Sequence, residues 1–265
     1  MPFMMEGMAS WDPGQYNRFA EERARPFHEL VARIPTTAAV AVADVGCGPG
    51  NMTATLAERW PDAAVLGLDS SPDMIAAAER FKSPQLRFQL ADASTWRPQR
   101  GSLDVIVANA SLQWVDDHET LLPAWAAALD DGGTLAFQVP IAGYDPGFAA
   151  IAQRPHWAER LRGAAAVTGP RSASPVLDAE EYVRLLSAAG LTVDAWQTTY
   201  YHVLPGDDPV FEWFKGTGLR PYLDALDDAE AFAEEVRVEL RARFPREPFG
   251  TILPFPRLFV VAHRA

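Results

Sequence analysis

A glycine-rich segment between an apolar run and a helical pattern is the strongest chemical signal in the sequence. It reads Asp44-Val45-Gly46-Cys47-Gly48-Pro49-Gly50 and closes the apolar run 40–45. Glycines at such a point let the backbone turn tightly and come close to a ligand. A dinucleotide-binding loop would carry glycine at the sixth position counted from Gly46, but that position is Asn51, and no phosphate-binding lysine follows. The spacing therefore disfavours a dinucleotide and a phosphate cradle.

Three polar residues stand at the ends of the next apolar runs. Asp69, Asp92 and Asn109 each follow a run with the composition of a buried strand. A carboxylate at Asp69 can accept hydrogen bonds from both ribose hydroxyls of an adenosine. Asp92, followed by Ala93, is placed to reach the adenine amino group. Together with the glycine loop, these positions predict a site for an adenosine-containing cofactor.

The elements that must position these residues alternate along the first half of the chain. Apolar runs predict strands at 40–45, 64–68, 86–90, 103–108 and 134–139, and periodic segments predict helices at 51–60, 72–81 and 117–129. Before them, we expect Pro26 to break the helical opening segment into two helices. Strands that alternate with helices indicate an α/β fold with a doubly wound, mostly parallel, Rossmann-like sheet.

The second half is organised differently. Asp178 and Gly190 delimit a predicted helix, and strands are expected at 191–204 and 258–263. The acidic, aromatic segment between those strands is predicted to be helical. A connection of that length is too long for a plain loop, so we interpret it as a lid over the carboxyl ends of the strands. The predicted organisation is a single domain, 1–265, with a helical cover at 1–35, a cofactor-binding core at 36–140 and a helical lid insertion at 205–255.

Composition excludes several classes of protein. The formal net charge of −12 disfavours nucleic-acid binding. We expect no membrane segment, because no apolar run approaches the roughly 20 residues that span a bilayer. A single cysteine, Cys47, excludes an intramolecular disulfide and fits the cytoplasm. The five histidines and Cys47 show no metal-ligand spacing, so we expect no metal site.

The strand ends together resemble the signature of class I S-adenosylmethionine-dependent methyltransferases over about residues 40–139. The flanking segments resemble one family within that class, the trans-aconitate 2-methyltransferases. The segments that carry this closer resemblance run from residue 11 to residue 259: Trp11-Asp12-Pro13 with Tyr16, Glu22-Arg23-Ala24-Arg25-Pro26, Ala108-Asn109-Ala110-Ser111-Leu112-Gln113-Trp114, Thr198-Thr199-Tyr200-Tyr201-His202, Gly216-Thr217-Gly218-Leu219-Arg220-Pro221 and Phe255-Pro256-Arg257-Leu258-Phe259.

The resemblance implies S-adenosyl-L-methionine as cofactor and a small tricarboxylate as substrate. The residues expected to bind the cofactor are Tyr16, Arg25, Asp44, Gly46, Cys47, Gly48, Asp69, Ser70, Met74, Asp92, Ala93 and Asn109. The residues expected to bind the substrate are Trp11, Gln113, Trp114, Tyr200, Tyr201, Arg220 and Arg257. Arg25 is the candidate for the cofactor's own carboxylate, with Tyr16 closing over it. The adjacent Tyr200 and Tyr201 should face opposite ways in a strand, so only one should line a pocket.

The implied chemistry is in-line transfer of the sulfonium methyl to a carboxylate oxygen. No catalytic base is assigned, because the nucleophile is already ionised, and His202 is expected to be structural. A methyltransferase for another small acid, a non-catalytic binding protein for the cofactor and a nicotinamide oxidoreductase remain alternatives. The sequence leaves open which carboxylate is esterified, how broad the substrate range is, and the oligomeric state, for which a monomer is favoured.

Overall fold

The computed structural model describes residues 20–162 and 176–265. Its helices are α2 (Ala20–Ala32), α3 (Asn51–Arg59), α4 (Pro72–Ala78), α5 (Leu122–Ala128), α6 (Phe148–Ala152), α7 (Pro155–Arg160), α9 (Ala179–Ala188), α10 (Pro209–Lys215), α11 (Arg220–Asp224) and α12 (Ala229–Arg243). Its strands are β1 (Ala41–Val45), β2 (Ala64–Asp69), β3 (Leu86–Leu90), β4 (Leu103–Asn109), β5 (Leu129–Pro140), β6 (Thr192–Leu204), β7 (Arg246–Glu247) and β8 (Gly250–His263).

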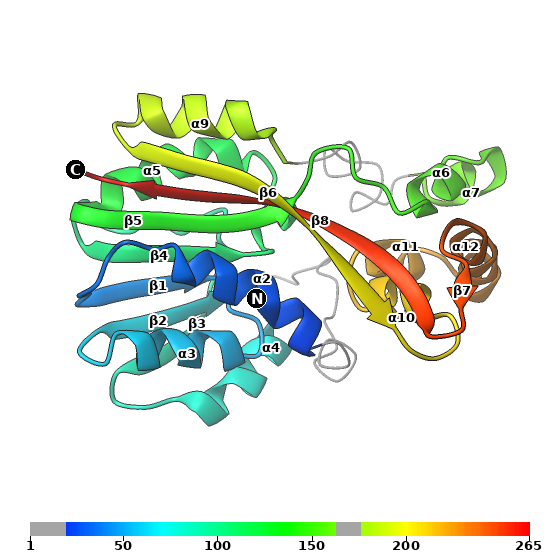
Figure 1. Cartoon of the computed structure of the whole chain (residues 1–265), viewed down its shortest axis with the longest axis horizontal. Helices are drawn as coiled ribbons and strands as arrows, with labels where there is room; N and C mark the ends of the chain where they lie inside the picture. The colour runs from blue at the N-terminus through cyan, green and yellow to red at the C-terminus, as the bar shows by residue number, and fades with distance from the viewer. Residues whose placement is uncertain (1–19, 163–175) are drawn as a thin grey trace, which may run out of the picture. The chain divides into compact units, whose positions relative to one another are not determined.

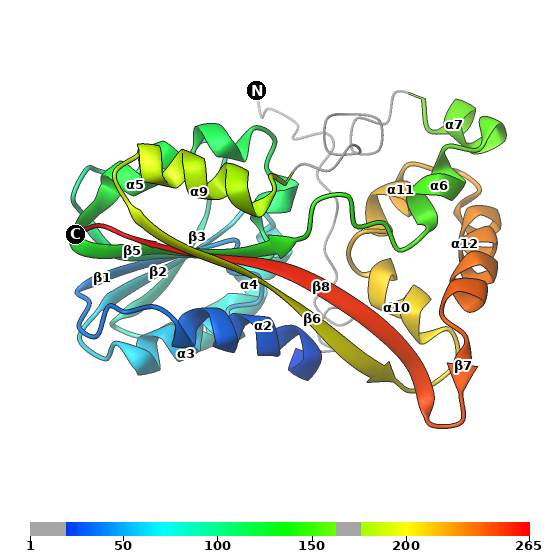
Figure 2. The same cartoon turned by 45° about the horizontal axis from the view of Figure 1, so that its top comes forward.

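The strands form one sheet in the order β3-β2-β1-β4-β5-β8-β6 (Figure 1). β1 to β5 pair in parallel, and β8 runs antiparallel to β5. Helices α5 and α9 cover one face, and α2 and α3 cover the other (Figure 2). This arrangement confirms the predicted doubly wound, mostly parallel sheet, in which the ends of β1, β2 and β4 meet at one edge.

The chain divides into two compact units that share β6 and β8. The unit that carries most of the sheet contains residues 20–142, 174–199 and 256–265. Its core is built from the buried faces of β1, β4 and β5 with α5 and α9, and includes Trp125, Phe137 and Tyr182. The buried Tyr182 hydroxyl lies 2.7 Å from Nε2 of His118, which ties the segment before α5 to α9. Burial lowers the pKa of His118, which disfavours the charged form of its imidazole.

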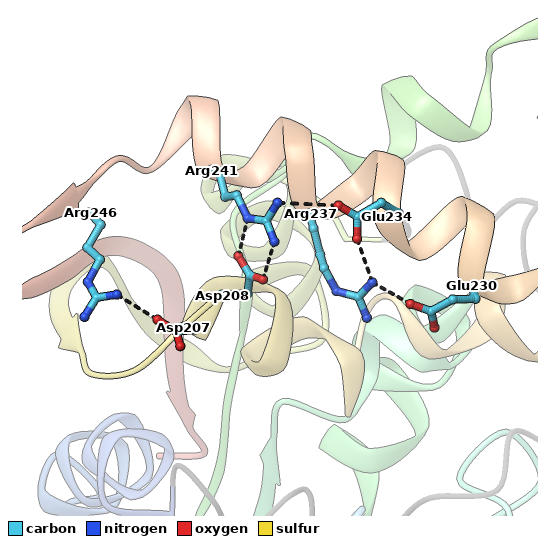
Figure 3. A network of polar contacts seen from close by, with 7 residues as sticks. All are labelled: Asp207, Asp208, Glu230, Glu234, Arg237, Arg241 and Arg246. Carbon is cyan, nitrogen blue, oxygen red and sulfur yellow. Dashed lines mark hydrogen bonds and ion pairs between the residues drawn. The ribbon is translucent and has the colours of Figure 1, made fainter.

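The second unit contains the helical segment after β6. Its core is aromatic and includes Phe148, Trp157, Phe211, Trp213 and Phe232. At the surface, a chain of ion pairs joins the start of α10 to α12 and to β7, as Figure 3 shows. The residues in this network are Asp207, Asp208, Glu230, Glu234, Arg237, Arg241 and Arg246. Within this network, Glu234 forms ion pairs with Arg237 and Arg241.

Three predicted elements need correction. Pro26 lies inside the continuous helix α2, so the predicted break there is wrong. Proline inside a helix costs about 3 kcal/mol, and complete burial of Phe27 and Leu30 offsets that cost at about 1.5–3 kcal/mol for each side chain. The predicted helix 117–129 is a short 3₁₀ turn, His118–Thr120, followed by α5, because Pro123 favours the first turn of a new helix.

The third correction concerns the end of the helical segment. The final strand begins at Gly250 and not at 258, so helices fill only part of 205–254. The first residues of β8 alternate between buried and exposed, with Thr251 and Leu253 facing inward and Ile252 outward. That period of two is typical of a strand with one solvated face.

Candidate functional site

The glycine loop after β1 adopts the backbone that its sequence predicts. Gly46 has φ of 79° and Gly48 has φ of 55°, both in the left-handed region that favours glycine. A Cβ at Gly46 would lie 2.3 Å from the Cβ of Ser111, so the loop packs directly on the turn after β4. The Ser111 hydroxyl also donates to the carbonyl oxygen of Val45 at 2.7 Å. At Gly48, by contrast, no atom of residues 20–162 and 176–265 other than its chain neighbours lies within 4 Å of the Cβ position.

Asp44 is a buried carboxyl beneath this loop. It is 2% exposed, and the hydroxyl of Thr53 in the first turn of α3 donates to its Oδ2 at 2.7 Å. Burial raises the pKa of Asp44 to about 7, with a smaller contribution from the charge of Asp69, against the lowering effect of Thr53. The carboxyl therefore titrates near neutral pH, and a cation nearby would favour its charged form.

Asp69 joins the loop to the turn after β2. Its Oδ2 accepts the backbone N–H of Gly48 at 2.9 Å, and its Oδ1 accepts that of Ser71 at 2.8 Å. Each carboxylate oxygen has a second lone pair, which can accept a hydrogen bond from a hydroxyl group of a ligand. The side chain is half-buried, and burial raises its pKa despite these hydrogen bonds. Asp69 thus holds the loop in shape and keeps acceptor capacity for a ligand.

The other candidates around the loop differ in exposure. Met74 is buried on α4, whose N-terminus is capped by the Ser71 side chain. Cys47 is buried, and burial together with the charges of Asp44 and Asp69 raises the pKa of its thiol, so it is not a ready nucleophile.

Three more of these candidates lie near the ends of β2 and β3. Ser70 and Ala93 are half-buried. Asp92 is exposed, and its Oδ1 accepts the backbone N–H of Ser94 at 2.8 Å. Through this hydrogen bond, Asp92 stabilises the turn that follows β3.

The end of β4 carries a chain of side-chain hydrogen bonds. Arg257 Nε donates to Oε1 of Gln138 at 2.6 Å, and Gln138 Nε2 donates to Oδ1 of Asn109 at 2.7 Å. Arg257 is 4% exposed and Gln138 is 2% exposed. The predicted residues Asn109 and Arg257 are thus brought together by Gln138, which sequence reasoning missed.

The turn that follows Asn109 is constrained. Ala110 has φ of 53°, which is unfavourable for a residue with a Cβ. Gln113 Nε2 donates to the Ala110 carbonyl oxygen at 2.8 Å. Within the described residues, the buried Oε1 of Gln113 has no hydrogen-bond donor, so it is an acceptor that a ligand could satisfy. Trp114 is half-buried beside it in the chain.

The tyrosine pair on β6 faces opposite ways, as predicted. Tyr200 is 2% exposed and Tyr201 is 69% exposed, so only Tyr200 faces the protein interior. Two residues further on, the His202 ring stacks on that of Trp213 with centroids 5.1 Å apart. The structural role expected for His202 stays a prediction.

Two arginines predicted to bind ligands are engaged in ion pairs. In α11, Arg220 Nε lies 3.0 Å from both carboxylate oxygens of Asp224. In α2, the exposed Arg25 pairs with Glu29 at 3.1 Å. Trp11 and Tyr16, the remaining predicted ligand-binding residues, lie outside the described residues.

Two kinds of feature are absent from the part of the chain that the structure describes. In residues 20–162 and 176–265, no helix is long and apolar enough to cross a membrane. In the same ranges, no cluster of three or more His, Cys, Asp or Glu residues is arranged to hold a metal ion.

The residues that sequence reasoning missed had weak signals. Gln138 is a polar residue inside the otherwise apolar segment Leu135–Val139, where both faces of the sheet are covered. Thr53 and Ser111 are short hydroxyl residues close to the predicted strand ends. Only the structure shows that the Thr53 hydroxyl donates to Asp44 and that the Ser111 hydroxyl donates to the Val45 carbonyl oxygen.

Comparisons with known proteins agree with this geometry. A model of a methyltransferase domain family matches residues 42–133, which include the glycine loop and the ends of β2, β3 and β4. The structure is similar to an S-adenosylmethionine-dependent methyltransferase from Mesorhizobium loti, with a TM-score of 0.52 and 20% identity, covering 91% of this chain and 98% of that one. It is also similar to phosphoethanolamine N-methyltransferase 2 of Haemonchus contortus, solved with S-adenosyl-L-methionine, with a TM-score of 0.56 and 16% identity, covering 91% of this chain and 52% of that one. These structural similarities establish the fold.

Relatives that match nearly the whole chain are more specific. The trans-aconitate 2-methyltransferase of Streptomyces avermitilis is 46% identical over 273 aligned positions, which cover 98% of this chain and 99% of the relative. The trans-aconitate 2-methyltransferase of Escherichia coli is 42% identical over 260 positions, covering 97% of this chain and 99% of the relative. Identity at this level over both chains shows that the protein belongs to the trans-aconitate 2-methyltransferase family.

Proposed function

We propose that the protein transfers the methyl group of S-adenosyl-L-methionine to a carboxylate of trans-aconitate, giving a monomethyl ester and S-adenosylhomocysteine. The observation that carries the choice of substrate is the extent of the similarity. The methyltransferase domain model covers only residues 42–133, whereas the relatives named for trans-aconitate match 97–98% of the chain. The similarity thus includes the second half of the chain, where substrate specificity is expected to reside.

The loop region fits the cofactor chemically. Asp69 retains acceptor capacity for ribose hydroxyls, and the space beside Gly48 allows close approach to the backbone. Asp44, whose pKa lies near 7, would be favoured in its charged form by the positive sulfonium. When bound, the cofactor supplies an electrophilic methyl group. Asp92 and Ala93 would contact the adenine, Ser70 and Met74 would line the site, and Arg25 with Tyr16 would hold the cofactor's carboxylate.

The protein's own contribution is to bind and orient the substrate. A carboxylate is already ionised near neutral pH, so the nucleophile requires no general base. In a chain of net charge −12, a tricarboxylate needs local cations, and the planar guanidinium fork of arginine suits a carboxylate well. We assign this role to Arg257 and Arg220, and we expect Tyr200, the inward-facing tyrosine, to bind the substrate as well. Trp11, Gln113 and Trp114 are the other residues expected to bind it. Holding the reactants in line can supply on the order of 7–11 kcal/mol.

Methyl transfer measured in parallel on trans-aconitate, cis-aconitate, citrate and isocitrate tests this proposal. We expect kcat/KM to be highest for trans-aconitate. If another acid is the better substrate, the protein is a methyltransferase for that acid and the substrate assignment is wrong. No transfer to any of the four, with intact cofactor binding, would contradict the proposed reaction.

We also propose that the protein is a cytoplasmic monomer. Cys47 is the only cysteine in the sequence and is buried, so the chain has no intramolecular disulfide, which fits a reducing compartment. Light scattering coupled to size-exclusion chromatography should give a mass close to 29.0 kDa. A mass near twice that value would contradict the monomer.

A further inference from the structure

Strand register places three polar side chains on one face of the sheet. Asn109 on β4 pairs with Gln138 on β5, and Gln138 pairs with Phe259 on β8. Arg257 lies two residues before Phe259, and residues two apart in a strand share a face. Asn109, Gln138 and Arg257 are therefore neighbours across three adjacent strands, although Gln138 and Arg257 are 119 residues apart in the sequence.

The chemistry of arginine fixes the direction of the hydrogen bonds between them. A guanidinium only donates, so the Gln138 atom that faces Arg257 must be the oxygen, Oε1. Its amide nitrogen then faces Asn109, and an amide nitrogen only donates, so the Asn109 atom that receives it must be Oδ1. The Nδ2 donor of Asn109 is consequently the end of that amide directed away from Gln138. One buried cation thus sets the orientation of two amides.

The type of residue at 138 matters as much as its position. Gln138 is 2% exposed, and a buried polar group is costly unless its hydrogen-bond partners are satisfied. A leucine there would leave the Arg257 Nε without this acceptor. A glutamate would accept the same hydrogen bond but would neutralise the guanidinium. Glutamine holds Arg257 in place and leaves its positive charge intact.

We propose that Gln138 is a positioning residue for methyl transfer. It holds the Arg257 guanidinium ready for a substrate carboxylate, and it orients the Asn109 amide at the end of β4. The role toward substrate rests on the function proposed above, whereas the orientation of Asn109 by Arg257 through Gln138 does not.

Steady-state kinetics with Q138E tests the role toward substrate. We expect KM for trans-aconitate to rise about 10- to 100-fold, the range that corresponds to one hydrogen bond with a charged partner, while kcat changes much less. A residue with only a structural role would lower the amount of active enzyme, and hence apparent kcat, without this increase in KM. The matched control is Q89E, which adds the same charge at an exposed position on β3 and should leave both constants unchanged. An unchanged KM in folded Q138E would overturn the proposal.

A second measurement needs neither cofactor nor substrate and does not depend on Q138E folding. Side-chain amide signals of Gln138 and Asn109 are recorded by ¹H–¹⁵N NMR in wild type, R257A and the control R246A, whose guanidinium pairs at the surface with Asp207. We expect R257A to shift both amide signals and R246A to shift neither. If R257A leaves the Asn109 signal in place, the coupling through Gln138 is wrong. If both signals shift but wild type does not methylate trans-aconitate, the coupling stands and the proposed substrate fails.

Discussion

Polar side chains have different roles in two regions of the molecule: the strand ends around the glycine loop, and the helical segment after β6. Around the loop, the polar side chains other than the exposed Asp92 are at least partly buried, and they bond to defined partners, as Asp69 does to Gly48 and Ser71. In the helical segment, the ion pairs are mostly exposed, and Asp207 and Arg246 are 91% and 66% accessible. Its stability comes instead from aromatic packing around Trp213. Polar substitutions should therefore change ligand binding in the first region and very little in the second.

The largest effect on stability should come from the aromatic core. Trp213 is 1% exposed and packs against His202 and Phe255, with ring centroids 5.1 Å away in each case. Trp213→Ala should lower the free energy of unfolding by about 3–5 kcal/mol, because it removes apolar burial and leaves a cavity. Urea denaturation followed by circular dichroism measures this change. A loss below 1 kcal/mol would mean that the helical segment is not held by its aromatic core.

The next effect should be on cofactor binding. Asp69→Ala should weaken S-adenosylmethionine binding by one to two decades, since a hydrogen bond with a charged partner is worth about 1.5–3 kcal/mol. Some of this loss will come from the loop itself, because Gly48 and Ser71 lose their acceptor. Calorimetric titration measures the affinity, and an unchanged Kd would remove Asp69 from the site.

The affinity for S-adenosylmethionine should depend on pH because of the buried carboxyl of Asp44 in the loop region. Asp44 has a pKa of about 7, raised by burial. Below that pH the Asp44 carboxyl is protonated. Because a cationic ligand binds better to the ionised carboxylate, binding of the cofactor below pH 7 must release a proton from Asp44. Affinity for S-adenosylmethionine should thus fall as the pH drops below 7, by at most tenfold per pH unit for one proton.

The control for this prediction is Asp44→Asn, which keeps an acceptor for Thr53 and cannot ionise. It should show a weaker dependence of affinity on pH than wild type. Identical pH profiles for the two proteins would mean that Asp44 does not respond to the cofactor's charge.

The smallest effect should come from the surface network of the helical segment. Asp207→Ala removes the 2.7 Å ion pair with Arg246 at an exposed position. Such pairs are typically worth about 0–1 kcal/mol, so the denaturation midpoint should barely move. A loss comparable to that of Trp213→Ala would contradict the contrast between the two regions.

The loop region was largely predictable from sequence because its signals are local. An apolar run followed by glycines determines where β1 ends, and Asp69 and Asn109 then fall at strand ends by counting along the chain. The error at Pro26 arose because tertiary burial of Phe27 outweighs a local helix-breaking tendency. The early start of β8 was missed because Pro254 and Pro256 fall inside the strand, and proline is atypical of a strand interior.

The contact between Gln138 and Arg257 was not predictable from sequence. It depends on the antiparallel register of β5 with β8, which pairs Pro140 with Arg257 and Gln138 with Phe259. Nothing local in the sequence specifies that register. The polar residue inside an apolar strand was the only available sign, and it could not identify its partner.

The most direct test of the account is Arg257→Ala, with turnover of trans-aconitate and affinity for S-adenosylmethionine measured on the same preparation. Removing one partner from a buried charged pair typically costs about 3–5 kcal/mol, so turnover should fall by at least about 100-fold. Cofactor affinity should change far less, because the glycine loop and Asp69 are intact. Arg257→Lys should recover little activity, because lysine keeps the charge but lacks the planar fork and the Nε that bonds to Gln138. Full turnover of trans-aconitate by the folded Arg257→Ala protein would contradict the assignment of Arg257 to the substrate carboxylate.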